Sequence, residues 1–320
     1  MKFAVVGSNT ISDSFALAVT KTQSEIVAVY SRTAEAGGKY QSKWGIKTLH
    51  TDFDEMLANP EVEGVYIATP NSLHHSQAVR VLNGGKHLLL EKPATLTAAE
   101  FDELTQIAKD KNLVFLEAMK PHFLPTYHEM KKSLAEVGTI RRASINFCRY
   151  STRYDNFKKG IIENAFIKQL GNGALMDIGV YPIAVMVMLF GKPEKVIATG
   201  EILDGSIDIT GTIICKYDGF NAVVSYSKVS SSYQPNEIEG EDGSILFENT
   251  SRAKCYTIKK SSGETEKLTY VYTDDQMIYE INQMDECTKT PSLAIHFNKM
   301  TKIALEIMEE AREQMGYFFR

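Results

Sequence analysis

The sequence has few cysteines and no paired cysteine motif. Four of its 320 residues are cysteine, and they stand far apart, at Cys148, Cys215, Cys255 and Cys287. Because no C-x-x-C pair is present, the pattern indicates neither a zinc ribbon nor a redox dithiol. A chain of this length buries a large core without disulfides or a metal. We therefore interpret the cysteines as separate thiols of a cytoplasmic protein.

Long runs of one chemical kind are also missing. The most apolar stretch, residues 178–190, contains Pro182 and is shorter than the about 20 residues that span a bilayer. The start of the chain turns polar directly after Gly7, too early for the apolar core of a signal peptide. Lysine and arginine total 35 against 40 acidic residues, so the net charge is -5. These features argue against nucleic-acid and membrane partners.

The first third of the chain alternates strand and helix patterns. A capping box, Thr97 to Glu100, opens one of the expected helices, which should run to about Lys111. Such alternation predicts a doubly wound parallel sheet with helices on both faces. The apolar runs expected to form its strands include residues 3–6, 25–30, 62–68, 87–90 and 114–116.

The pattern changes after about residue 120. Helical spacing over residues 123–134 leads to an extended stretch, 139–150, and a partly helical one, 173–190. From 194 to 271, strand patterns alternate with hairpin-forming turn dipeptides, and a helix follows over 295–315. We therefore expect an α/β protein with domains at 1–120 and 121–320, the second built on an antiparallel sheet. The turn dipeptides are Asp204-Gly205, Asp218-Gly219, Asp242-Gly243 and Ser262-Gly263.

The turn after the first strand has the context of a nucleotide phosphate site. Residues 7–12 read Gly-Ser-Asn-Thr-Ile-Ser, so only the first glycine of G-x-G-x-x-G is present. Asn9 tolerates a left-handed backbone, and Ser12 is small enough for a helix to pack closely. A strand before and a helix after the turn favour a pyrophosphate at the helix N-terminus. An ordinary strand-to-helix turn is the alternative interpretation.

The end of the second strand carries Ser31-Arg32. An NAD-selective site usually places an acidic residue there to bind the adenosine ribose. A guanidinium instead pairs with a phosphate through two charge-assisted hydrogen bonds. We therefore expect NADP(H) to be preferred over NAD(H), with a solvated loop charge as the alternative interpretation of Arg32.

Three motifs connect these features to a family. Residues 68–75 read Ala-Thr-Pro-Asn-Ser-Leu-His-His, residues 91–93 read Glu-Lys-Pro, and residues 177–182 read Asp-Ile-Gly-Val-Tyr-Pro. In this order and spacing, the whole chain resembles the glucose–fructose oxidoreductase and inositol dehydrogenase (Gfo/Idh/MocA) family. Tyr181 stands where many members have histidine. This variant is similar to the branch that contains glucose–fructose oxidoreductase and dimeric dihydrodiol dehydrogenase.

The resemblance implies an N-terminal Rossmann domain and a C-terminal domain with an open, mainly antiparallel sheet. It implies hydride transfer between NAD(P)(H) and a sugar-like or other small hydroxyl or carbonyl compound. It also implies a cis bond between Lys92 and Pro93, where cofactor and substrate meet, and a homodimer or homotetramer. The cofactor-binding residues expected on this basis are Gly7, Ser8, Asn9, Thr10, Ile11, Ser31, Arg32, Thr69, Pro70, Asn71, His74, Glu91 and Lys92.

One segment departs from the branch. Where relatives often read Glu-Ala-Met-Trp-Thr-Arg-Phe-Leu-Pro, residues 117–125 carry Lys120 in place of tryptophan and His122 in place of arginine. Relatives close their substrate pocket near this segment. The resemblance therefore identifies a chemical class of substrate and no particular sugar or diol.

We assign the chemistry to Lys92, Tyr181 and Asp177. An ammonium stabilises negative charge on the substrate oxygen and favours the phenolate of a nearby tyrosine, which then exchanges a proton with that oxygen. Asp177, four residues before Tyr181, shares its face if the segment is helical and orients Lys92 or accepts a substrate hydroxyl. Because Pro182 cannot donate to the carbonyl of Ile178, the helix should kink or restart there.

Three alternatives remain open at this stage. Without the family motif, Lys92 would be interpreted as a solvated charge and Tyr181 as a core residue. A non-catalytic NAD(P)-binding regulator would keep the same fold. An enzyme with tightly held nicotinamide would use it for an internal redox cycle, such as glycoside cleavage. The histidines have no metal-like spacing, so no metal is expected.

Overall fold

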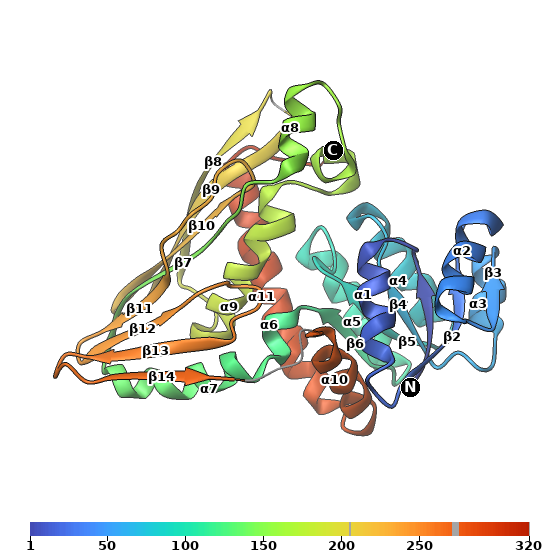
Figure 1. Ribbon diagram of the computed structural model, residues 1–320, viewed down its shortest axis with the longest axis horizontal. Coiled ribbons are helices and arrows are strands. Elements are labelled where there is room, and N and C mark those ends of the chain that lie inside the picture. The colour runs from blue at the N-terminus through green and yellow to red at the C-terminus, as the bar shows by residue number, and fades with distance from the viewer. Residues whose placement is uncertain (205, 271–274, 320) are drawn as a thin grey trace. The chain divides into compact units, whose positions relative to one another are not determined.

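The computed structural model describes residues 1–204, 206–270 and 275–319. The chain divides into two compact units, Met1–Lys120 with Thr273–Lys302 and Pro121–Tyr272 with Ile303–Arg320. Figure 1 shows the first unit in blue and cyan with the orange-red helix α10 (Met277–Lys289).

The expected division placed every residue after 120 in the second domain, and in this respect it differs from the structure. Helix α10 packs against α1 (Thr10–Val19) of the first unit. Helix α11 (Ser292–Gln314) begins in the same unit, where Asn298 Nδ2 donates to the carbonyl of Phe115 at 3.0 Å. These contacts join segments far apart in sequence, so no local pattern indicates them.

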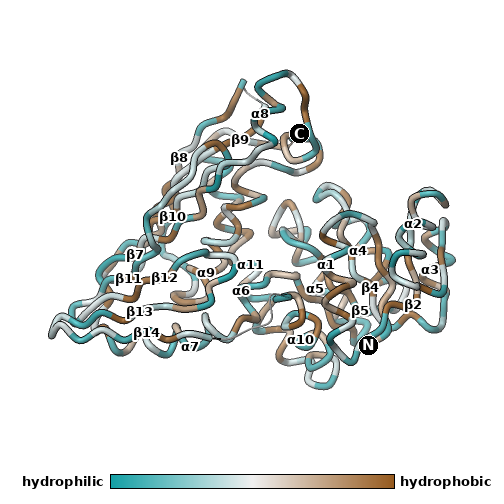
Figure 2. Tube along the Cα trace, in the orientation of Figure 1, coloured by the Kyte–Doolittle hydropathy of each residue, from teal (hydrophilic) through white to brown (hydrophobic). Residues whose placement is uncertain are grey.

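The first unit contains the predicted parallel sheet. Its six strands have the order β3-β2-β1-β4-β5-β6, and every neighbouring pair is parallel. The inner strands are almost continuously apolar and buried, as expected for strands covered on both faces (Figure 2). The order reverses between β1 and β4, the place where open α/β sheets bind ligands. The strands are β1 (Lys2–Val6), β2 (Glu25–Tyr30), β3 (Thr48–His50), β4 (Gly64–Ile67), β5 (His87–Glu91) and β6 (Phe115–Ala118).

Helix α5 begins where the capping box predicts it. Thr97 caps α5 by accepting from the N–H of Glu100. The Glu100 carboxylate accepts from the N–H of Leu96, one residue earlier than in a standard capping box. Besides α1, the helices before β6 are α2 (Ala34–Trp44), α3 (Phe53–Ala58), α4 (His74–Asn83) and α5 (Ala98–Asp110), with a 3-10 turn at Asn71–Leu73.

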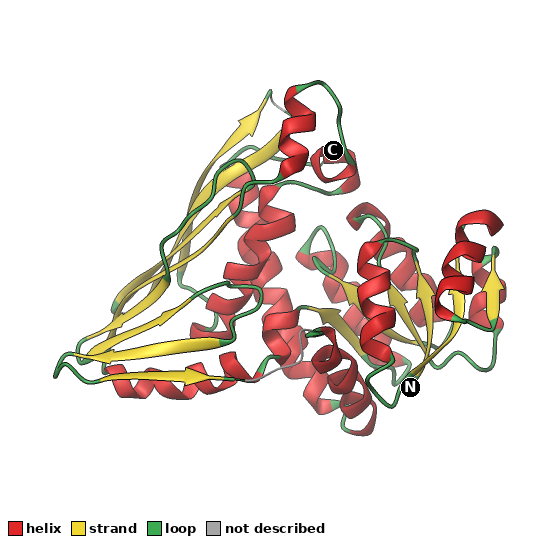
Figure 3. Cartoon of the chain, viewed as in Figure 1, coloured by secondary structure: helices red, strands yellow, loops and turns green. Residues whose placement is uncertain are grey.

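The second unit contains an eight-stranded sheet of order β14-β13-β12-β11-β7-β10-β9-β8 (Figure 3). All neighbours are antiparallel except β10 and β7, which run parallel. The mainly antiparallel sheet is therefore confirmed. The strands are β7 (Ile140–Cys148), β8 (Lys195–Leu203), β9 (Ile207–Tyr217), β10 (Phe220–Ser227), β11 (Asn236–Gly240), β12 (Gly243–Phe247), β13 (Cys255–Lys260) and β14 (Thr265–Thr269).

The predicted turn dipeptides at residues 218–219, 242–243 and 262–263 lie at connections between neighbouring strands. Gly219 joins β9 to β10 with φ +80°, and Gly263 joins β13 to β14 with φ +95°, conformations that glycine adopts without steric cost. Gly205 and residue 271, the predicted end of the strand region, lie outside the described residues.

Helices pack against this sheet. The helix predicted over residues 123–134 is interrupted at Leu124, whose backbone is extended. Pro125 is the reason, because proline disfavours helical backbone in the residue before it. Helix α9 packs against β7 and β10. The helices are α6 (Lys120–Phe123), α7 (Pro125–Ser133), α8 (Thr152–Lys158) and α9 (Val180–Phe190), with 3-10 turns at Leu134–Val137, Asn164–Phe166 and Lys168–Leu170.

One segment is long and apolar enough to cross a membrane by length and composition. It covers Lys168–Phe190, 23 residues with a mean hydropathy of 1.9 in its most apolar window. Within the structure, 78% of that window is buried in the protein. Its apolar side chains thus form part of the core of the second unit.

Candidate functional site

Gly7 directly follows β1, at a point that tolerates no side chain. Its φ is +112°, and a Cβ atom there would lie 2.7 Å from the carbonyl oxygen of Ala68 at the end of β4. The first glycine of the phosphate turn is therefore required both by backbone conformation and by close approach of β4.

Asn9 fixes the start of α1. Its Oδ1 accepts from the N–H groups of Ile11 and Ser12 at 2.9 and 3.0 Å, and its Nδ2 donates to the carbonyl of Ala68 at 2.7 Å. The backbone of Asn9 is extended, with φ −100° and ψ −178°, so the left-handed conformation that asparagine tolerates is not adopted here. The physical reason is that an N-cap residue has extended backbone while its side chain satisfies the first amides of the helix.

The remaining residues of the turn fit a pyrophosphate. Ser8, Asn9 and Thr10 are exposed at the N-terminus of a ten-residue helix, whose dipole favours an anion. The N–H of Ile11 bonds to Asn9, whereas its side chain is exposed, so a contact between Ile11 and the cofactor stays a prediction. Ser12 is fully buried, as expected for close packing of the helix.

Ser31 and Arg32 follow β2 at the same edge of the sheet. The N–H of Ser31 donates to the carbonyl of His50 at 3.1 Å, which fixes the chain there, and Arg32 is exposed. A cavity of about 250 Å³ lies between the phosphate turn and α2. Its acidic residue, Asp13, pairs with Lys43 at 2.8 Å, which offsets the negative charge facing a phosphate. The cavity is lined by Ser8, Asp13, Ala36, Lys39, Tyr40 and Lys43.

His74 connects the two loops that carry the family motifs. Its Nδ1 lies 2.9 Å from the carbonyl oxygen of Pro93, and its Nε2 lies 2.9 Å from that of Thr69. Burial lowers the pKa of His74, and the two carbonyls oppose this shift. The side chain is 0% exposed and has no surface to offer a nicotinamide. The structure gives His74 a positioning role in place of the direct cofactor contact expected from the resemblance.

The neighbouring loop is held in a similar way. The hydroxyl of Thr69 donates to Gln77 of α4 at 2.7 Å. Pro70 precedes the 3-10 turn that begins at Asn71, so the three residues form a tight connection between β4 and α4. All three are partly exposed and accessible to a ligand at the carboxyl edge of the sheet.

Glu91 anchors the Glu-Lys-Pro segment. Its carboxylate accepts from the hydroxyl of Tyr66 at 2.6 Å and from the N–H of Lys92 at 3.2 Å. The side chain is buried, so it holds the end of β5 in place. Lys92 is partly exposed at that strand end, and the bond between Lys92 and Pro93 is cis, as the resemblance implies.

Two buried carboxyl groups lie near Glu91, and the sequence analysis missed both. Glu117, on β6, accepts from the N–H of Ala94 and the hydroxyl of Thr301, each at 2.9 Å. Burial raises the pKa of Glu117 to about 7. Glu280, on α10, is 0% exposed, and burial together with Glu91 raises its pKa well above the usual range. An acidic residue within the apolar strand Phe115–Ala118 is the signal that could have identified Glu117.

Asp177 is paired within the second unit. Its Oδ2 lies 2.9 Å from Nζ of Lys228, which also donates to the carbonyl of Ala165 at 3.2 Å and lies 4.9 Å from the ring centre of Phe166. The Lys228 side chain is 5% exposed and that of Asp177 is 36% exposed. The buried ammonium thus holds a carboxylate that remains accessible. Lys228 was not predicted, because nothing near it in the sequence resembles a motif.

The helix that carries Asp177 is irregular, as expected. Residues Leu175–Gly179 form a π turn directly before α9. The carbonyl of Ile178, to which Pro182 cannot donate a hydrogen bond, lies in this wider turn. The N–H of Leu175 donates to buried Asp208 at 2.7 Å, and burial raises the pKa of Asp208 to about 6. Asp208 therefore anchors the start of the π turn.

Tyr181 lies in the first turn of α9, half buried. Its ring contacts that of Phe147 on β7 edge to face, with ring centres 5.6 Å apart. Lys92 belongs to the first unit, whereas Tyr181 and Asp177 belong to the second. The convergence of the three groups on one substrate remains a prediction.

Comparisons with known proteins agree with this architecture. Residues 1–119 match the model described as "Oxidoreductase family, NAD-binding Rossmann fold", and residues 127–246 match the "GFO/IDH/MocA C-terminal domain". Together they cover most of the chain.

Individual relatives cover the chain from end to end. It is 41% identical to scyllo-inositol 2-dehydrogenase (NADP(+)) IolU of Bacillus subtilis, over 100% of this chain and 98% of that protein. It is 25% identical to trans-1,2-dihydrobenzene-1,2-diol dehydrogenase of Xenopus tropicalis, over 98% of each. Among solved structures, KijD10, a 3-ketoreductase from Actinomadura kijaniata in complex with NADP and TDP-benzene, superposes with a TM-score of 0.88 at 19% identity, over 98% of each chain. At that identity the likeness concerns the fold alone.

Proposed function

Because this chain belongs to the Gfo/Idh/MocA oxidoreductase family and is an NAD(P)-dependent dehydrogenase, we propose that it prefers NADP(H) and interconverts a cyclic polyol with its ketone. The observation that carries the proposal is the end of β2, where Ser31 and Arg32 stand in place of an acidic residue. The polyol is proposed because the relative with 41% identity is named for scyllo-inositol and NADP(+).

The cofactor residues act at the carboxyl edge of the first sheet. Gly7, Ser8 and Thr10 would hold the pyrophosphate, with Asn9 keeping the helix start in place. Ser31 and Arg32 would hold the 2′-phosphate, with Arg32 supplying charge-assisted hydrogen bonds. When bound, the nicotinamide supplies the carbon that accepts or donates the hydride.

The residues of the chain move the proton and stabilise charge. In oxidation, the alcohol carbon loses a hydride and the alcohol oxygen passes its proton to Tyr181, while Lys92 stabilises the negative charge that develops on that oxygen. In reduction, neutral Tyr181 returns the proton. Asp177, held by Lys228, accepts a hydrogen bond from a second substrate hydroxyl, which orients the ring.

The experiment is a steady-state assay of NADP⁺ and NAD⁺ reduction with scyllo-inositol, myo-inositol and glucose. We expect turnover of an inositol with a kcat/KM for NADP⁺ at least about tenfold above that for NAD⁺, since one charged hydrogen bond contributes about 1.5–3 kcal/mol. Tight NADPH binding without turnover of any polyol would instead support a regulator. Glycoside cleavage without net change in the cofactor would support an internal redox cycle.

Two further features belong to this proposal. We propose a cytoplasmic homodimer or homotetramer assembled through the open face of the second sheet. Ile197 and Ile214 are paired neighbours on β8 and β9, and they are 49% and 38% exposed. Exposed apolar pairs of this kind favour a protein contact. Light scattering of wild type and of the Ile197→Lys, Ile214→Lys double variant tests it, and an unchanged mass in the variant would contradict it.

A further inference from the structure

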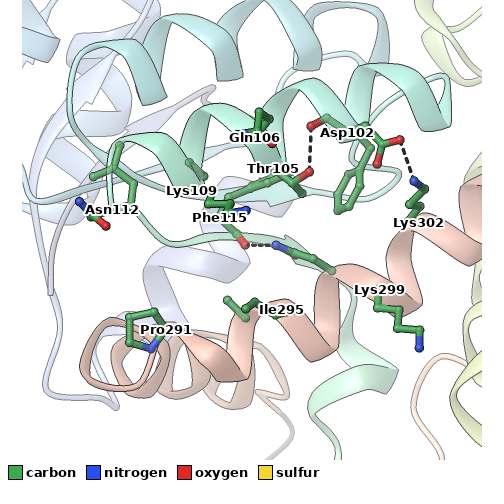
Figure 4. A pocket seen from close by; sticks show the side chains of 15 residues that line it. Asp102, Thr105, Gln106, Lys109, Asn112, Phe115, Pro291, Ile295, Lys299 and Lys302 are labelled. Atoms are coloured by element: carbon green, nitrogen blue, oxygen red, sulfur yellow. Dashed lines mark hydrogen bonds and ion pairs between the residues drawn. The ribbon is translucent and has the colours of Figure 1, made fainter.

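A cavity within the first unit is lined by none of the residues assigned above. It has a volume of about 610 Å³, within the range of small-molecule sites. Figure 4 shows it between α5 and α11, with Phe115 of β6 between the two helices. Each helix contributes residues three or four positions apart, which is one face of a helix. The lining residues are Phe101, Asp102, Thr105, Gln106, Ala108, Lys109, Asn112, Leu113, Phe115, Pro291, Ala294, Ile295, Asn298, Lys299 and Lys302.

The floor of the cavity is apolar. Phe101 and Phe115 are each 1% exposed, and Ala108 and Ala294 are also buried. Ile295 also lines the cavity and is 71% exposed, so its apolar side chain is accessible to solvent. This surface suits the flat or ring-shaped apolar body of a small ligand.

One polar atom of the lining is left without a partner. Asn298 donates through Nδ2 to the carbonyl of Phe115 at 3.0 Å, and this bond fixes the orientation of the amide. Its Oδ1 is buried and accepts no hydrogen bond within the part of the chain that the structure describes. A buried acceptor without a donor is unfavourable, so a ligand that brings an N–H or O–H group to this atom gains affinity.

The charged residues of the lining are mostly basic. Lys302 pairs with Asp102 at 2.7 Å, which neutralises both side chains. Lys109 and Lys299 are exposed and have no ion-pair partner among the described residues, so they leave an excess of positive charge. An anionic group on the ligand would complement these two ammonium groups.

We propose that this cavity is a second ligand site, which binds a small amphipathic organic anion. The ligand has an apolar ring body against Phe101 and Phe115, a hydrogen-bond donor for Asn298, and an acidic group near Lys109 and Lys299. None of these residues belongs to the cofactor or substrate residues assigned above. The inference is therefore independent of the proposed polyol reaction.

The test uses 8-anilinonaphthalene-1-sulfonate, which combines two aromatic ring systems, one N–H donor and a sulfonate. Its fluorescence is titrated with wild-type protein in saturating NADP⁺, which removes binding at the cofactor site. We expect saturable binding of one probe per chain. Lys299→Glu should weaken it at least about tenfold by replacing attraction with repulsion. Ala294→Trp should abolish it by filling the cavity, whereas Lys267→Glu, which makes the same charge change on strand β14 of the second unit, should leave it unchanged.

The outcomes separate the alternatives. Displacement of all probe by NADP⁺ overturns the proposal, as does wild-type affinity in folded Lys299→Glu. If Ala294→Trp fails to fold, Lys109→Glu takes its place, because an exposed side chain tolerates the change. Light scattering of Ile295→Lys provides the remaining test. A loss of mass there would show that a second copy of the chain covers this surface, and would also overturn the proposal.

Discussion

The buried carboxyl of Glu117 is expected to make the protein less stable as the pH rises through neutrality. Burial raises the pKa of Glu117 from 4.5 to about 7. The folded state therefore holds this proton more tightly than the unfolded state does. The stabilisation that protonated Glu117 provides is fully present below about pH 4.5 and is lost as the pH rises through about 7.

Glu117→Gln isolates this effect. A glutamine keeps the shape of the side chain, accepts from the N–H of Ala94 through its oxygen and donates to the hydroxyl of Thr301 through its nitrogen. A pKa of about 7 in place of 4.5 corresponds to about 3 kcal/mol of unfolding free energy once the carboxyl is ionised in both states. The wild type should therefore lose about 2–3 kcal/mol more than the variant between pH 5 and pH 8.

Urea unfolding at a series of pH values provides the assay. The single tryptophan, Trp44, lies in the same unit as Glu117, so its fluorescence reports unfolding of that unit. The exposed Glu61→Gln serves as the matched control and should follow the wild type at every pH. Parallel curves for wild type and Glu117→Gln would refute the reasoning, because they would mean that Glu117 binds its proton equally tightly in the folded and the unfolded state.

Three further predictions concern the proposed reaction. Lys92→Met should lower kcat roughly a hundredfold to a thousandfold while NADPH still binds, measured by turnover and by fluorescence titration, because charge on the substrate oxygen loses its stabilising ammonium. Arg32→Asp should weaken NADPH at least about tenfold more than NADH in the same titration, and equal losses would contradict the assignment of the 2′-phosphate to Arg32. Lys228→Met should lower kcat roughly tenfold to a hundredfold and alter its pH profile, since Asp177 loses the cation that holds it. Lys228→Arg should restore part of the activity, whereas a profile identical to wild type in Lys228→Met would show that the pair serves the fold alone.

The site illustrates where local patterns were sufficient. Gly7 was identified because a tight turn after a strand needs glycine, and the structure shows the carbonyl of Ala68 that excludes any other residue. The irregular helix before Tyr181 was predicted from the missing N–H of Pro182. In both cases the cause is covalent or lies within a few residues of its effect.

Other features of the site were not accessible in this way. His74 was interpreted as a cofactor contact, yet its ring is buried between carbonyls of Thr69 and Pro93. Lys228 holds Asp177 across a large separation in sequence. Each contact joins two segments that come together only when the chain folds. A single sequence does not show which distant segments will be in contact.

The sequence by itself determined the alternation of strands and helices in the first third of the chain, the turn at Gly7 and the family to which the motifs belong, since periodicity, capping and turn residues act over short distances. Only the tertiary structure decided that α10 and the start of α11 join the first unit, that burial raises the pKa of Glu117 to about 7, and that a cavity opens between α5 and α11. These properties arise from desolvation and from packing between distant segments. Desolvation and packing both depend on which atoms are shielded from water by their neighbours. Those neighbours are determined only by the folded structure.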